Sequence, residues 1–140
     1  MRQKILDFMR MHNHCVISTI GPEGYPQSAL VGFSQNDGLE LIIGTTSDSR
    51  KYKNIVQSPH VAIVIGFGED KTSIQYEGTA SLLEGEEKGQ RLEAHYRKLP
   101  AALKHNDSPT QVYFKIQPLW VRYTDIGAES KEMEELRFPT

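Results

Sequence analysis

The chain of 140 residues has little cysteine, no long apolar run and no strong excess of charge. Its single cysteine, Cys15, excludes an intramolecular disulfide framework. No apolar run approaches the roughly 20 residues of a membrane span, and the charged opening residues lack the apolar stretch of a secretory signal. Lys and Arg number 16 against 18 Asp and Glu, for a formal charge of −2. This balance argues against a nucleic-acid coat protein, whose domains are usually strongly basic.

What is present is the composition of one ordinary globular domain. A chain of this size buries about two-thirds of its unfolded surface, so it needs neither a disulfide nor a metal for stability. Charged residues make up 24% of the chain and the mean hydropathy is −0.49. We therefore expect a soluble cytoplasmic protein with no membrane or nucleic-acid partner.

Apolar periodicity predicts a helix followed by three strands in the first third of the chain. Ile5, Phe8, Met9 and His12 recur at helical spacing. Strands are expected over residues 14–20, 27–35 and 39–45. Residues 21–24 have the Pro and Gly of a tight turn, and the Asp-Gly pair at 37–38 favours a hairpin.

The rest of the chain continues with strands and helices at similar spacing. We expect a helix over 47–57, a strand over 61–65 that is buried on both faces, an alternating strand over 73–83 and a helix over 84–98. A last strand over 112–123 is interrupted or bent at Pro118. The fold class is mainly β (α+β): a six-stranded antiparallel barrel with flanking helices. Residues 1–126 form the domain. Residues 127–140 are an acidic tail, either partly disordered or docked on a partner.

The segment Gly-Thr-Thr-Ser-Asp-Ser-Arg-Lys at 44–51 joins a predicted strand to a predicted helix. Thr46, Ser47 and Asp48 are candidate N-caps, which places Arg50 and Lys51 in the first turn. Cations there oppose the helix dipole. Together with hydroxyls and free helix N–H groups, however, they make an anion site suited to phosphate. The alternative is an ordinary surface helix with solvated basic residues.

Other segments carry weaker signals. Gly32, inside a strand, fits either a flat ligand or a barrel corner. Trp120 and Arg122 share one face of the last strand, where they suit an interface or a planar ligand, or simply stack on each other. The run 12–15, His-Asn-His-Cys, lacks a second cluster to complete a metal site, so no metal is expected. Cys15 is better explained as a small core residue than as a nucleophile.

The order and spacing of several short motifs resemble the flavin-binding split-barrel superfamily, in particular its short pyridoxamine phosphate oxidase-related and general-stress-like members. The motifs lie between residues 5 and 125: they are Gly-Tyr-Pro-Gln-Ser at 24–28, Asp-Gly at 37–38, Thr45 with Ser-Arg-Lys at 49–51, Asn-Ile at 54–55, Ser-Pro-His-Val-Ala at 58–62, Glu-Gly-Thr-Ala at 77–80 and Pro-Leu-Trp-Val-Arg-Tyr at 118–123.

The resemblance implies a homodimer that holds two FMN molecules at its interface. It implies that Arg50 and Lys51 hold the phosphate and that a flavin-contacting glutamine position falls at Ser73, with Gln75 on the same face. The further cofactor-binding residues implied are Thr45, Thr46 and Ser49 near the phosphate, Ser28, Ala29, Leu30, Val31 and Gly32 along the ring, and Trp120 and Arg122 reaching across to the partner.

Two departures from the family pattern argue against pyridoxamine phosphate oxidation itself. Leu99 stands where an arginine that binds the substrate phosphate is expected, and the long C-terminal substrate-binding segment is missing. We therefore predict an FMN-dependent oxidoreductase acting on a small molecule that the sequence does not name, with no residue assigned as acid or base. The alternatives are a non-catalytic flavin carrier or redox sensor, and the same fold binding a deazaflavin or haem.

Overall fold

The computed structural model describes residues 2–68, 71–127 and 132–139. Its elements, in chain order and with η for a short 3-10 helix, are α1 (Arg2–Arg10), β1 (His14–Ile20), η1 (Pro22–Gly24), β2 (Pro26–Gln35), β3 (Leu41–Thr46), α2 (Arg50–Gln57), β4 (His60–Ile65), β5 (Thr72–Leu82), α3 (Gly85–Lys98), η2 (Pro100–His105), β6 (Gln111–Asp125) and β7 (Glu132–Arg137). Each predicted helix and strand is found, with ends that differ by a few residues.

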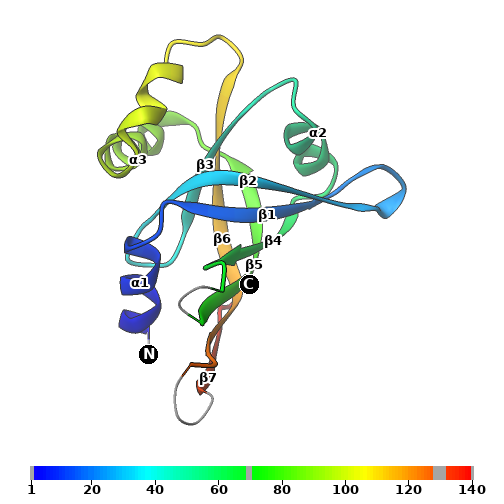
Figure 1. The fold of residues 1–140 in the computed structure, drawn as a ribbon. Coiled ribbons are helices and arrows are strands. Elements are labelled where there is room, and N and C mark those ends of the chain that lie inside the picture. Colours follow the sequence, from blue (N-terminus) through cyan, green and yellow to red (C-terminus); the bar gives the residue numbers. More distant parts are fainter. Residues whose placement is uncertain (1, 69–70, 128–131, 140) are drawn as a thin grey trace.

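The strands form one antiparallel sheet in the order β3-β2-β1-β4-β5-β6-β7, and a further pairing of β3 with β6 closes the first six into a barrel. Figure 1 shows the three α-helices lying around the outside of this barrel. Alternate residues of each strand point inward and form the core, as Ile74, Tyr76 and Ala80 do on β5. The predicted six-stranded split barrel with flanking helices is therefore confirmed.

Strand β6 continues through Pro118, where an interruption or a bend is predicted, and its ladder with β5 is irregular there because a proline cannot donate to it. The β5–β6 register slips between Glu77 and Gly78, so that Gly78 pairs with Pro118 and Leu119 is left bulged. The backbones approach closely at this bulge: a Cβ on Gly78 would lie 2.7 Å from the Gln117 carbonyl oxygen. Only glycine fits there.

Strand β4 differs from its prediction of burial on both faces. Val61, Ile63 and Ile65 are buried, whereas Ala62 and Val64 are exposed. One face of β4 meets the barrel core and the other lies on the outside of the sheet. Because both faces carry apolar side chains, the sequence alone does not show which one is covered. An apolar strip is therefore exposed on the outer side of the barrel.

The predicted acidic tail also differs from expectation. Residues 132–137 form β7, which pairs with residues 120–125 of β6, and Leu136 and Phe138 pack against the core. The acidic composition of this segment does not predict a strand. Its strand conformation comes from pairing with the open edge of β6. Residues 128–131 and 140 of the predicted tail lie outside the described residues.

The barrel is split between β2 and β3. These two strands pair only where Phe33–Gln35 meets Leu41–Ile43, although β2 begins at Pro26 and β3 continues to Thr46. Beyond the paired residues the strands part, and α2 follows directly after β3 and contacts both β1 and β3. The sequence-predicted site residues of β2, β3 and α2 are distributed along this split.

Candidate functional site

The turn that leads into α2 is held by its own hydroxyl groups. Ser49 is the N-cap, and its Oγ accepts a hydrogen bond from the backbone N–H of Tyr52 at 3.1 Å. The hydroxyl groups of Thr45 and Ser49 are 2.9 Å apart, and Thr46 donates to the Asp48 carboxylate at 2.6 Å. The prediction of an N-cap at 46–48 is therefore wrong, because the Thr46–Asp48 bond closes the turn and the helix begins three residues later than expected.

Arg50 and Lys51 occupy the first turn of α2 as predicted. Within the described parts of the chain, no carboxylate lies within ion-pair distance of either side chain. Both line a small cavity of about 90 Å³. The other residues that line it are Thr19, Gln27, Ser28 and Ala29. The sequence analysis predicts an anion site at this turn, so we call the space lined by these six residues the anion cavity.

A buried amide joins α2 to the hairpin on the other side of this cavity. Asn54 Nδ2 donates to Thr19 Oγ1 at 3.0 Å and to Gln27 Oε1 at 2.9 Å. The sequence analysis quoted Asn54 only as part of a motif and assigned it no role. The signal that could have found it is a polar residue on the buried stripe of a short amphipathic helix.

The exposed side of the sheet, which we call the outer face, is crossed by two rows of paired residues. The first row runs Leu30, Val16, Val64, Gln75, Arg122 and Glu135; the second runs Ser28, Ser18, Ala62, Glu77, Trp120 and Arg137. Five predicted site residues, Ser28, Leu30, Gln75, Trp120 and Arg122, thus belong to one continuous surface. Ser73 lies on the same side of β5, one step beyond the first row.

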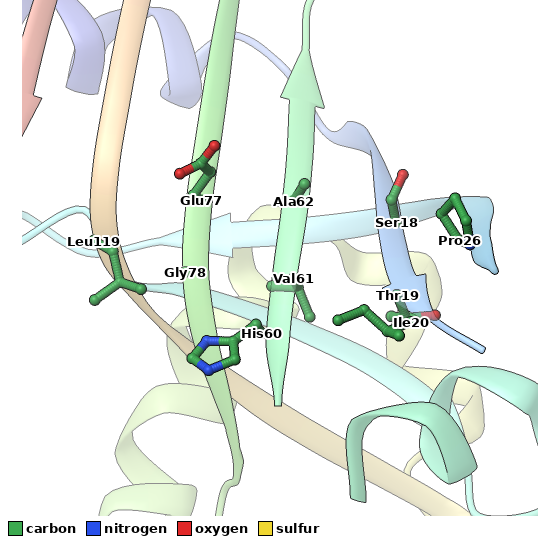
Figure 2. A pocket seen from close by; sticks show the side chains of 10 residues that line it. All are labelled: Ser18, Thr19, Ile20, Pro26, His60, Val61, Ala62, Glu77, Gly78 and Leu119. Atoms are coloured by element: carbon green, nitrogen blue, oxygen red, sulfur yellow. The ribbon is translucent and has the colours of Figure 1, made fainter. Parts of the chain in front are cut away.

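A cleft of about 400 Å³ opens on the outer face where β1 and β4 separate. Figure 2 shows Glu77, Ala62 and His60 on two neighbouring strands, with Ser18 and Pro26 on the other side of the cleft. Thr19 lines both this cleft and the cavity beside Arg50. The anion cavity and the cleft on the outer face therefore adjoin at Thr19.

Trp120 and Arg122 are held together by β7. The Arg122 guanidinium lies 5.0 Å from the Trp120 ring centroid. Glu135 accepts from Trp120 Nε1 at 3.2 Å and from Arg122 Nε at 3.0 Å. Hydrogen bonds from Arg122 and Trp120 keep the pKa of the Glu135 carboxyl below its usual value. The Trp–Arg stacking that the sequence analysis gave as the alternative to an interface or ligand contact is present, and the sequence analysis missed Glu135.

The remaining predicted residues lie on the inner side of the split. Ala29 lines the anion cavity, and Val31 packs against the core. Gly32 faces the end of α3, where an added Cβ would lie 3.2 Å from Leu99 Cδ1. Its glycine is explained by this close approach of a side chain.

Gly32 and Thr45 also line a second cavity of about 160 Å³, together with His95. The His95 Nδ1 is 2.7 Å from the Ser34 hydroxyl. Burial, helped by the charge of Lys98, lowers the pKa of His95 to about 4, so the imidazole is neutral at physiological pH. The sequence analysis assigned His95 no role.

Two properties of the described residues bear on other functions. No group of three or more His, Cys, Asp or Glu side chains in them is arranged to hold a metal ion. No helix among them is both long and apolar enough to cross a membrane. Cys15 is fully buried, and burial raises the pKa of its thiol to about 12, as suits a core residue.

Several known proteins are similar to this chain. A pyridoxine/pyridoxamine 5'-phosphate oxidase of Microcystis aeruginosa is 31% identical over 75 residues, which are 54% of this chain and 35% of that protein. The general stress protein 26 of Bacillus subtilis is 25% identical over 138 residues, 96% of each chain. The crystal structure of general stress protein 26 from Bacillus anthracis has a TM-score of 0.77 at 26% identity and covers 98% of both chains.

More distant structures share the fold. A haem-binding protein of Mycobacterium smegmatis has a TM-score of 0.80 at 18% identity, with 97% of this chain and 56% of that one covered. A pyridoxamine 5'-phosphate oxidase-related, FMN-binding protein of Nostoc punctiforme has a TM-score of 0.64 at 17% identity, with 99% and 92% covered. Finally, the family model described as pyridoxamine 5'-phosphate oxidase matches residues 1–125. The chain therefore belongs to the pyridoxamine 5'-phosphate oxidase family.

Proposed function

We propose that this protein is a homodimeric flavoprotein that binds FMN along the split between β2 and β3. The observation that carries the proposal is the pair Arg50 and Lys51, two cations without a described carboxylate partner beside a cavity of about 90 Å³. Their unfavourable place in the helix dipole is compensated when a phosphate dianion binds. The residues present thus fit the phosphate end of the cofactor.

The other described contacts assign roles to the residues around that end. Arg50 offers a bidentate grip and Lys51 a point charge, while Ser28, exposed on β2, offers a hydroxyl at the rim of the cavity. Thr45 and Ser49 act indirectly, because their hydroxyl groups bond each other and hold the start of the helix. When bound, FMN supplies hydride and electron transfer at its isoalloxazine ring.

The dimer is supported by the outer face. Leu30 is 64% exposed and Val64 is 40% exposed in the single chain, within a row that also holds Val16. An apolar strip of this kind on a β-sheet marks an interaction surface. A second copy that covers this strip would bring its Gln75, Trp120 and Arg122 toward the ring, and would leave an opening for a small-molecule redox substrate.

Two other functions remain as alternatives with their own support. The haem-binding protein of the same fold supports haem as the ligand, and the absence of an assigned acid or base is compatible with a flavin carrier or redox sensor. The visible spectrum of the purified protein tests the ligand. We expect the two flavin absorption bands; an intense haem Soret band in their place would contradict the proposal.

Catalysis is tested separately from binding. We expect the FMN-loaded protein to pass electrons continuously from a reduced nicotinamide donor to a quinone or oxygen acceptor. A protein that holds FMN but supports only a single reduction, without turnover over a panel of donors and acceptors, would instead be a carrier or sensor.

A further inference from the structure

Asn54 is a buried polar residue in the middle of the helix that carries the anion-site cations. The residue is 5% exposed, and both hydrogens of its amide are used, one toward Thr19 Oγ1 and one toward Gln27 Oε1. Both acceptors line the anion cavity. A single side chain therefore ties α2 to two strands of the barrel at the cavity itself.

The position of Asn54 along α2 places it on the same side as the cations. It follows Arg50 by four residues and Lys51 by three, and these spacings bring helical side chains to one face. The cations and the amide thus point toward the β1–β2 hairpin from successive turns. If the two hydrogen bonds of the Asn54 amide change, α2 and its two cations move relative to Ser28 and the hairpin.

The hairpin side of this contact is also fixed. The Gln27 side chain lies over Gly21, where an added Cβ would be 2.9 Å from both Gln27 Cδ and Nε2. Gly21 also donates its N–H to the Tyr25 carbonyl at 2.7 Å, which closes the hairpin turn. The glycine therefore leaves room for Gln27 to direct its oxygen toward Asn54.

We propose that Asn54 is the positioning residue of the anion cavity, and that it sets the preference of this protein for a phosphorylated over an unphosphorylated flavin. The inference rests on the proposed function. The amide fixes the distance between the cations of α2 and the β1–β2 hairpin, and it does so without a charge. An aspartate at this position has nearly the same shape, so it would preserve the contact, and its negative charge would weaken the binding of an anion in the cavity.

The experiment is the variant Asn54→Asp, measured with FMN and with riboflavin. The Thr19 hydroxyl and the Gln27 amide can both act as donors, so the aspartate can keep the two bonds with their direction reversed. A negative charge close to the phosphate should weaken FMN binding by roughly tenfold or more, while riboflavin binding changes by less than about twofold because it lacks the charged group. The loss should shrink as salt is added.

Gln57→Asp is the matched control, because it adds the same charge to an exposed position of the same helix. It should leave the ratio of the FMN and riboflavin dissociation constants unchanged. Thr19→Val is the second test, since it keeps the volume and removes one of the two acceptors. We expect it to lower the FMN preference by about threefold, the effect of one weakened hydrogen bond.

The outcomes separate this inference from the function on which it rests. Equal affinities of the wild-type protein for FMN and riboflavin would overturn the proposed phosphate site. A wild-type preference for FMN that either Asn54→Asp or Thr19→Val leaves intact would overturn the role of Asn54 and leave the phosphate site standing. Reduced thermal stability with an unchanged preference in Thr19→Val has the same meaning, because a structural role does not alter the ratio.

Discussion

Acid should destabilise this protein through His95, well before most carboxylates are protonated. The imidazole is 2% exposed. Its Nδ1 is 2.7 Å from the Ser34 hydroxyl, and the rings of Tyr96 and Tyr113 pack edge-on against it at centroid distances of 5.9 and 5.7 Å. No described carboxylate is paired with it. Protonation in the folded state therefore places an uncompensated charge in the core.

The size of the effect follows from the shift in pKa. Burial lowers the pKa of His95 from 6.5 to about 4. Between these values the unfolded chain binds the proton and the folded chain does not, so stability is fully present above the unfolded pKa and falls as the pH drops toward the folded one. The slope approaches 1.4 kcal/mol per pH unit, and the whole window corresponds to about 3 kcal/mol of unfolding free energy.

The assay is urea unfolding of the wild-type protein and of His95→Asn at about pH 7 and about pH 5, where the wild-type protein should lose about 2 kcal/mol through this histidine. The asparagine can bond Ser34 but does not titrate, so its loss over the same interval should be smaller by that amount. His105→Asn, at an exposed position, is the control and should behave as wild type. An identical pH dependence of wild type and His95→Asn would refute the reasoning.

Two further predictions concern the outer face and the core. Val64→Asp puts a carboxylate on the exposed apolar strip and should convert the expected dimer to a folded monomer in light scattering, because a charge in an apolar interface is strongly unfavourable. The control Val56→Asp, which changes a more exposed valine on α2, should leave the dimer intact. A dimeric Val64→Asp would place the interface elsewhere. Cys15 should resist an exposed-thiol reagent in the native protein and react fully in urea, since raising the pKa to about 12 leaves roughly a thousandfold less thiolate; prompt native labelling would contradict its burial.

Periodicity predicts a strand well where its residues alternate between a covered and an open side. Strand β5 illustrates this: Ile74 and Tyr76 are buried, and Gln75 between them is exposed. Strand β4 could not be predicted in the same way. All of residues 61–65 are apolar, so the sequence does not distinguish burial in the core from burial in an interface with another chain.

The sequence identifies candidate site residues whose role follows from their neighbours in the chain. It does not identify residues whose role depends on contacts with distant parts of the chain. Arg50 and Lys51 stand out because cations in a first helical turn need a reason to be there. Asn54 and Glu135 do not stand out, because their roles come from partners 27 or more and 13 or more residues away. The N-cap at Ser49 was missed for a different, local reason: Thr46 bonds Asp48 two residues further on, so these residues form a turn and the helix begins after Ser49.

The central claim is that Arg50 and Lys51 hold the phosphate of FMN, and the most direct test is the thermal unfolding of Arg50→Ala/Lys51→Ala with and without FMN. Both side chains lie in the first turn of α2 and have no described ion-pair partner, so the apo variant should melt at nearly the wild-type temperature. Added FMN should raise the melting temperature of the wild-type protein and leave that of the variant unchanged. A variant that is stabilised by FMN as much as the wild type would contradict the account.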